Sequence, residues 1–151
     1  MKTVGFCSLL LIAVLAAGFS TADGGIGFRQ STAVAGRLIC EGRPVGGVHV
    51  KLYDEDRTDI DDLMAEGYTD SRGYFYLAGY EDEITPIDPK LNITSFHYHN
   101  CYNSIFRCQR KLQIRIPDDY ISRGQIPHKL YNLGVLNLDG EIEGEEHDCF
   151  N

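Results

Sequence analysis

AGRLICEGRPVGGVHVKLYDED, residues 35–56, is the stretch of sequence that decides the fold. Its second half, VHVKLY at 48–53, alternates apolar and polar side chains with a period of two. Such alternation is typical of a β-strand that buries one face and exposes the other. The preceding GRPVGG, residues 42–47, concentrates glycine and proline, which favours a turn. The stretch therefore predicts a strand at 32–40, a tight connection and a second strand at 48–53.

The same pattern recurs outward from this stretch. KLQIRI at 111–116 and YFYLA at 74–78 also alternate, and DSRG at 70–73 is a type I turn signature. Further strands are predicted at 63–69, 90–98 and 129–138. No run predicts a long helix, although 60–66 and 118–124 could each form a single helical turn. Seven or eight short strands separated by turns predict an all-β, antiparallel β-sandwich.

Composition restricts the class of protein and of partner. The chain has 151 residues, 43% hydrophobic and 24% charged, which suits one folded domain and excludes a disordered or fibrous chain. The net charge of −8 argues against nucleic acid, because phosphate binding needs a basic surface. The sequence contains no glycine-rich phosphate loop and no recognisable catalytic motif, so we predict no cofactor and no enzymatic activity.

The N-terminus reads as a secretory signal peptide. Lys2 precedes the apolar run LLLIAVLAA at 9–17, which is far shorter than the roughly 20 residues of a membrane span. Cleavage is predicted after Ala22, with Gly18 and Ser20 as alternative sites. No other segment approaches spanning length. The sequence therefore predicts a secreted, extracellular protein without a transmembrane segment.

This cleavage defines the predicted domain organisation. Residues 1–22 form the signal peptide, 23–31 a linker, and 32–151 the sandwich domain with an irregular acidic tail at 139–148. Removal of 22 of the 151 residues leaves 129 and, because Lys2 is lost, a net charge of −9.

Four cysteines remain after cleavage, and an even number in an oxidising compartment predicts two disulfides. Zinc ligation is disfavoured because no CxxC pair occurs. Three connectivities are compatible with four cysteines. The short Cys101–Cys108 spacing suits a local clamp, which leaves Cys40 to pair with Cys149.

Together these residues resemble the transthyretin-like family best known from nematodes. The resemblance rests on residues 35–56 and on DDLMAEGYTDSRGYFYLAG (61–79), EITPIDPKLNI (83–93), CQRKLQIRIPDDYI (108–121), YNLGVLNL (131–138) and the closing DCFN. The positions of the four cysteines also fit. The resemblance implies a secreted β-sandwich of the prealbumin-like, immunoglobulin-like kind and supplies no settled activity.

One enzyme of the wider superfamily, 5-hydroxyisourate hydrolase, offers a check. Its family pattern carries a histidine on the first strand and a closing Tyr-Arg-Gly-Ser. Here the first strand reads STAVAGRLIC and the chain ends in DCFN, so both elements are missing. Such a hydrolase needs cationic and general-base groups that converge on the substrate. A degenerate hydrolase is therefore the least favoured function.

Two groups of potential metal ligands have simpler interpretations. His97 and His99 would share one face of a strand, but no third ligand is fixed by spacing. Five aspartates could form a loose calcium loop: Asp54, Asp56, Asp59, Asp61 and Asp62. An EF-hand is excluded because its sixth and twelfth positions hold Asp59 and Ala65. The alternative is a solvated loop in which Asp61 or Asp62 caps a turn at 63–66. We predict no metal site.

Three surface features complete the set. Asn92-Ile93-Thr94 is an N-glycosylation sequon, so we predict a glycan on Asn92, whose parity opposes that of Leu91 and Ile93. Six aromatic residues are either ordinary outward-facing sheet residues or the lining of an exposed binding surface: Tyr74, Tyr76, Tyr80, Tyr98, Tyr102 and Phe106. Four basic residues could meet an anionic surface or pair with nearby acids: Arg107, Arg110, Lys111 and Arg115.

From these features we predict a secreted, non-catalytic binding or bridging protein, extracellular or at the cell surface. Its partner would be an extracellular protein, a lipid headgroup or a small hydrophobic molecule, engaged through loops or one sheet face. The alternative is a carrier of a small hydrophobic ligand, held within the sandwich or between subunits.

Overall fold

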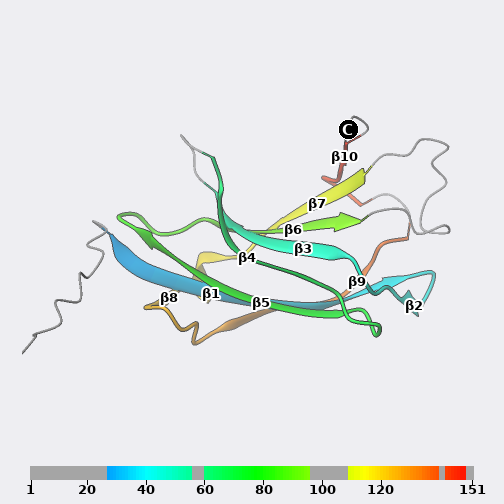
Figure 1. The fold of residues 1–151 in the computed structure, drawn as a ribbon, viewed down its shortest axis with the longest axis horizontal. Coiled ribbons are helices and arrows are strands. Elements are labelled where there is room, and N and C mark those ends of the chain that lie inside the picture. The colour runs from blue at the N-terminus through cyan, green and yellow to red at the C-terminus, as the bar shows by residue number, and fades with distance from the viewer. Residues whose placement is uncertain (1–26, 56–59, 96–108, 140–141, 149–151) are drawn as a thin grey trace, which may run out of the picture.

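The computed structural model describes residues 27–55, 60–95, 109–139 and 142–148, which form two packed β-sheets (Figure 1). Sheet A contains β1 (Phe28–Cys40), β2 (Arg43–Pro44), β5 (Tyr74–Glu83), β8 (Ser122–Arg123) and β9 (Leu130–Asn137). Sheet B contains β3 (His49–Asp54), β4 (Asp62–Tyr68), β6 (Pro89–Ser95), β7 (Gln109–Arg115) and β10 (Glu146–Asp148), in the order β10-β7-β6-β3-β4. A single 3₁₀ turn, η1 (Asp118–Tyr120), separates β7 from β8. The predicted all-β sandwich is confirmed.

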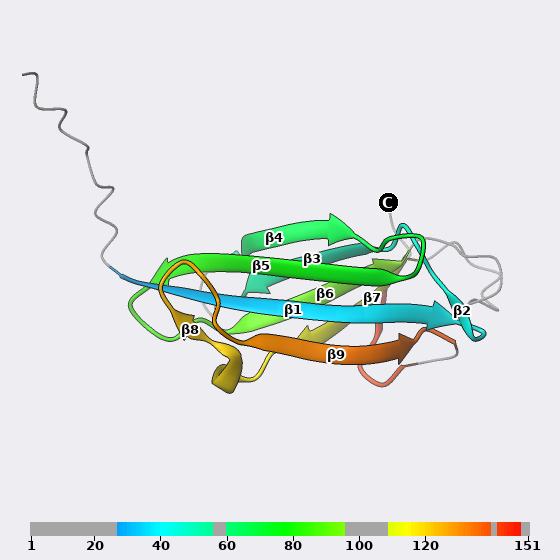
Figure 2. The ribbon, with the colours of Figure 1, turned by 90° about the horizontal axis from the view of Figure 1, so that it is seen from below.

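One strand pair departs from the antiparallel expectation. β1 pairs with β5, β2 and β8 antiparallel, but with β9 in parallel. Figure 2 shows β5, β1 and β9 side by side, with sheet B behind them. The physical reason is the path of the chain, which crosses to sheet B and returns before β9 is laid down. A parallel pair needs such a long crossover, whereas a hairpin gives antiparallel neighbours.

The core lies between the sheets and follows the alternation read from the sequence. In β3 the side chains of Val50 and Leu52 are fully buried, while the intervening Lys51 faces outward. Gly36 of β1 lies opposite Phe75 of β5, and a Cβ at Gly36 would come within 2.9 Å of the phenyl ring. The remaining fully buried aliphatic side chains include Val34, Leu38, Leu91 and Ile116.

The turn predicted at 70–73 is confirmed and joins β4 to β5. The amide of Gly73 donates to the carbonyl of Asp70 at 2.9 Å. The Asp70 carboxylate accepts hydrogen bonds from the amides of Arg72 and Tyr74 at 2.9 and 2.8 Å. Gly73 has φ +80°, a conformation that glycine adopts without strain. This turn fixes where β5 begins and which of its side chains face outward.

The sequence predicts two single helical turns, and the structure contradicts one of them. Residues 60–66 form no helical turn, and neither Asp61 nor Asp62 caps one, because 62–68 is strand β4, paired with β3. Met, Ala and Glu in this segment favour helix only weakly, and pairing outweighs that preference. At 118–124 a single turn does form, limited to η1. No helix in the described part of the chain is long and apolar enough to span a membrane.

The C-terminal acidic segment is more ordered than the irregular tail that the sequence predicts. Glu146–Asp148 forms β10, which pairs with β7. Glu145 forms a buried ion pair with Arg110, and both side chains are only 6% exposed. The guanidinium of Arg110 also donates to the carbonyl of Leu138 at 2.7 Å. The tail is thus fastened to sheet B by a buried charge pair as well as by strand pairing.

Candidate binding face

The outer face of sheet A carries exposed aromatic side chains along β5. The period of two turns Phe75 and Leu77 into the core, where each is 6% exposed. The tyrosines at the alternate positions of the strand face solvent: Tyr74 is 45% exposed, Tyr76 61% and Tyr80 41%. Three tyrosines thus lie on one face of one strand, with Ala78 between Tyr76 and Tyr80, and form an aromatic stripe.

Arginine side chains of the neighbouring β1 strand lie over this stripe. At one end, Arg29 lies 4.9 Å from the centre of the Tyr80 ring and donates two hydrogen bonds to Asp82, at 2.9 and 2.6 Å. The hydrogen bond from Arg29 lowers the pKa of the Asp82 carboxyl, and the same contact raises the pKa of Arg29. This end of the stripe is therefore charge-balanced.

The opposite end carries two guanidinium groups. Arg37 of β1 and Arg72 of the 70–73 turn lie 5.1 and 5.5 Å from the centre of the Tyr74 ring. The Arg37 Nε donates to the backbone carbonyl of Arg72 at 3.0 Å. Within the described residues, neither guanidinium forms an ion pair with a carboxylate. Both guanidiniums stay available to an anionic group.

We call Tyr74, Tyr76, Tyr80, Arg37 and Arg72 the tyrosine–arginine face. Tyrosine and arginine are the residue types that dominate binding energy at protein interfaces, because they combine a large apolar area with a polar end. β9 widens this side of the sheet with Leu130 and Val135, which are 46% and 60% exposed. The arrangement suits the docking of a protein surface.

The structure places three of the six aromatic residues on the outer face of β5. Tyr74, Tyr76 and Tyr80 lie together, whereas Tyr98, Tyr102 and Phe106 lie outside the described residues. Sequence reasoning missed Arg37 and Arg72. Their proximity to Tyr74 comes from the β1–β5 register, in which Arg37 lies opposite Tyr74, and from the turn that presents Arg72. Alternation alone shows that Arg37 faces outward but not which side chain it meets.

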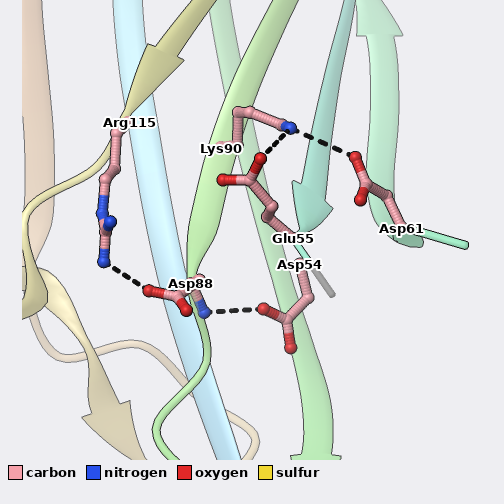
Figure 3. Close-up of polar contacts among 6 residues, drawn as sticks. All are labelled: Asp54, Glu55, Asp61, Asp88, Lys90 and Arg115. Atoms are coloured by element: carbon pink, nitrogen blue, oxygen red, sulfur yellow. Dashed lines mark hydrogen bonds and ion pairs between the residues drawn. The ribbon is translucent and has the colours of Figure 1, made fainter. Parts of the chain in front are cut away.

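The predicted aspartate loop is a network of ion pairs at one end of sheet B (Figure 3). The ammonium of Lys90 lies 2.9 Å from Glu55 and 3.2 Å from Asp61. Burial lowers the pKa of Lys90, but hydrogen bonds to Glu55 and Asp61 outweigh this effect, so the pKa lies above its ordinary 10.5. The carboxylate of Asp54 accepts a hydrogen bond from the amide of Asp88 at 2.6 Å. Of the predicted aspartates, Asp61 therefore pairs with a lysine, and Asp54 bonds to the backbone.

No group of three or more histidine, cysteine or carboxylate side chains in the described structure is arranged to hold a metal ion. Asp62 is exposed at the start of β4, and its register partner is Asp54. Asp56 and Asp59, like His97 and His99, lie outside the described residues, so the expectation about them stays untested.

The basic residues of β7 point to opposite sides of sheet B, because successive side chains of a strand alternate between its two faces. Arg110 points inward to Glu145, and Arg115 pairs with Asp88 and, at 3.7 Å, with Asp118. Two members of the group therefore pair with acids, as one of the two predicted interpretations holds. Lys111 faces outward without an ion pair in the described structure, and Arg107 lies outside it.

The predicted modification sites are placed as follows. Asn92 lies on β6, the middle strand of sheet B, and is 6% exposed. Glycosylation there stays a prediction. Cys40 is 8% exposed at the end of β1 and is disulfide-bonded. The other cysteines, Cys101, Cys108 and Cys149, lie outside the described residues, so the predicted pairs also stay predictions.

Comparison with known proteins shows to which family the chain belongs. The sequence profile of the Transthyretin-like family matches residues 35–117, which run from β1 through the end of β7. The chain belongs to the transthyretin-like family. Transthyretin-like protein 5 of Caenorhabditis elegans is 49% identical over 142 residues, covering 93% of this chain and 96% of that protein.

Two further Caenorhabditis elegans relatives support the assignment. Transthyretin-like protein 33 is 45% identical over 81% of this chain and 83% of its own length. Transthyretin-like protein 2 is 42% identical over 83% of this chain and 86% of its own length. The likeness extends over most of each chain.

Proposed function

We propose that this transthyretin-like protein is a secreted, non-catalytic extracellular binding or bridging protein. Its tyrosine–arginine face would dock an acidic surface of a protein partner. The observation that carries the proposal is the Arg37–Tyr74–Arg72 cluster, in which the half-buried Arg37 and the exposed Arg72 flank an exposed ring and form no ion pair among the described residues. Guanidinium groups bind carboxylates with two parallel hydrogen bonds, which favours a partner rich in Asp or Glu.

The size of the face favours a protein over a small molecule. Tyr74 and Tyr80 are six residues apart on β5, which corresponds to about 20 Å along the strand. A flat stripe of this length offers no enclosure for a small ligand. It does offer several separate aromatic anchors, which is how protein interfaces concentrate their binding energy.

Secretion and the absence of catalysis are supported by the sequence. The apolar run at 9–17 and the even number of cysteines after cleavage fit an exported protein. β1 contains no histidine, so the general base of the related hydrolase has no counterpart on that strand.

The alternative, a carrier of a small hydrophobic ligand, has less support. The space between the sheets is filled by side chains that are 8% exposed or less. Such close packing leaves no room for a ligand beside those residues without a change in the core. We therefore retain docking of a protein as the leading function.

The test is charge reversal on the face. The mature, oxidised protein would be immobilised and exposed to the extracellular fluid in which it occurs, and retained proteins would be identified by mass spectrometry. We expect the double variant Arg37→Glu, Arg72→Glu to lose at least about 90% of the capture of a specific partner, because each change places a carboxylate against an acidic surface. The charge-matched control is Arg123→Glu, Lys129→Glu, both exposed residues outside the face. Equal loss in both double variants, or none in the first, would refute the proposal.

A further inference from the structure

The Tyr80 end of the tyrosine–arginine face has a sequence feature that the proposed docking does not involve. Tyr80 is followed directly by Glu-Asp-Glu at 81–83, and residues 73–89 contain no Lys, Arg or His. Acidic side chains beside an exposed hydroxyl favour recognition by an enzyme whose binding site is basic. The local sequence therefore marks this hydroxyl as an acceptor for such an enzyme.

The side chain of Tyr80 is accessible from solvent in the folded protein. β5 is the last strand in the order of sheet A, and Tyr80 lies on its outer face, three residues before the strand ends. In the described part of the chain its hydroxyl forms no hydrogen bond, and its ring contacts the guanidinium of Arg29. An enzyme can therefore approach the hydroxyl without opening the sheet.

Two other tyrosines with neighbouring acids have less suitable surroundings. Tyr53 precedes acids at 54–55, but these two carboxylates are held in the polar network at the end of sheet B (Figure 3). Tyr120 follows two aspartates, but its ring packs against the core and, edge to face, against Tyr131. Tyr80 combines the acidic sequence with an accessible hydroxyl.

We infer that Tyr80 is sulfated on its phenolic oxygen in the secretory pathway. The donor is a nucleotide phosphosulfate, a polyanion, so the transferase that binds it needs a basic site, which the acids at 81–83 complement. The phenolic oxygen bonds to sulfur, the bond from sulfur to the donor's phosphate oxygen breaks, and the phenolic proton passes to a base of the transferase. No atom changes its oxidation state.

The charge of the added group favours sulfate over phosphate. A sulfate monoester carries a single negative charge, whereas a phosphate monoester would place close to two beside the same carboxylates. Arg29 donates to Asp82 through Nε and one terminal nitrogen, and its other terminal nitrogen has no partner among the described residues. That nitrogen can donate to a sulfate oxygen on Tyr80.

Sulfation would give the tyrosine–arginine face two ends of opposite charge. The sulfate would lie at Tyr80, and the guanidiniums of Arg37 and Arg72 lie beside Tyr74, about 20 Å away along β5. Such a separation of charge fixes the direction in which a partner lies on the face. The inference rests on the proposed secretion, but not on the docking of a partner.

Mass spectrometry tests the inference on mature protein collected from the medium of animal cells that secrete it. After removal of N-linked glycans, we expect the protein to carry the mass of one SO₃ group, which phosphatase does not remove. Tyr80→Phe should lose this mass and still fold, because the hydroxyl forms no hydrogen bond within the described residues. The matched control Tyr76→Phe, at a more exposed tyrosine without adjacent acids, should keep it.

Each other outcome counts against the inference. A secreted protein without the added mass, removal of that mass by phosphatase, or its retention in Tyr80→Phe would refute sulfation of Tyr80 and leave the proposed function standing. Failure of the protein to reach the medium would refute the proposed secretion and this inference with it.

A second pair of variants tests the role of the acidic segment. Glu81→Gln, Glu83→Gln neutralises two acids beside the acceptor and keeps the ion pair of Asp82. We expect the sulfated fraction to fall at least about tenfold, because the segment no longer complements a basic site. Asp139→Asn, Glu143→Gln removes the same charge at exposed positions elsewhere and should leave the fraction unchanged. No fall in the first double variant, or an equal fall in both, would contradict the inference.

Discussion

At the scale of the residue, this protein places its charges by alternation. Arg110 has the same parity as Leu112 and therefore points inward, where Glu145 neutralises it. On β6, Lys90 alternates with the buried Leu91 and pairs with Glu55 and Asp61 on the outer side of sheet B. Position along a strand thus decides whether a basic side chain finds its acidic partner inside the fold or on its outer side.

Lys90 makes the stability depend on pH in a defined direction. Its pKa in the folded state lies above the ordinary 10.5, so its contribution is complete below that value and is lost as pH rises through the higher folded pKa. At about pH 8 we expect Lys90→Met to lower the free energy of unfolding by about 1–2 kcal/mol, because two carboxylates lose their partner. The difference from the unaltered protein should shrink on titration above about pH 10.5.

Urea unfolding of both proteins over this pH range measures the difference. Lys129→Met, at an exposed position with a single contact to a backbone carbonyl, is the control and should change stability little at any pH. A difference between Lys90→Met and the unaltered protein that stays constant into the alkaline range would contradict the assigned role of the ammonium.

At the scale of the element, β10 shows how the chain end is secured. The strand is only three residues long, and pairing over three residues adds little stability by itself. The preceding Glu145 adds stability through its ion pair with Arg110, which lies on β7, the strand that pairs with β10. The ion pair and the short strand act together.

Glu145→Gln is therefore expected to destabilise the protein strongly. The variant keeps the shape of the side chain but removes the carboxylate charge that pairs with the buried guanidinium of Arg110, which costs about 3 kcal/mol or more. Urea unfolding of the oxidised protein gives the value. Asp82→Asn breaks the exposed Arg29–Asp82 pair as a matched control and should have a much smaller effect. Similar losses in both variants would show that burial of the pair does not matter.

Several of these strands could be predicted from the sequence, but most of their long-range contacts could not. The strands at 48–53, 74–78 and 111–116 were predictable because alternation is local, and β3, β5 and β7 contain most of them. Arg110 could be placed inward for the same reason, but its partner lies 35 residues away and alternation carries no information on it. The segment 60–66 was ambiguous because its residues tolerate both helix and strand, and pairing with β3 decides the outcome.

The candidate site likewise has some features that the sequence predicts and others that it does not. The outward direction of Tyr74, Tyr76 and Tyr80 follows from the period of β5. The contact of Arg37 with Tyr74 depends on the register between β1 and β5, which brings together residues from distant parts of the chain. The parallel alignment of β9 depends on the overall path of the chain and could not be read from any segment.

At the scale of the whole molecule, the two outer faces differ in chemistry. Sheet A presents exposed tyrosines with two arginines, whereas sheet B presents a hollow that is about half polar and is lined by two lysines. Both positive clusters belong to an acidic protein, so each is a local exception to the net charge of −8. A sandwich with two distinct faces is suited to bring two different partners together, which is what bridging requires.

The central claim is that the tyrosine–arginine face contacts a protein partner. Photo-crosslinking tests it most directly, with a photoreactive phenylalanine in place of Tyr76 on sheet A or, as a control, of Tyr68 on sheet B, which is 66% exposed. In the native extracellular fluid we predict a discrete crosslinked protein from position 76 and none of the same mass from position 68. Arg37→Glu, Arg72→Glu should abolish it. Crosslinks of equal yield from both positions, or a crosslink from position 76 that survives charge reversal, would contradict the account.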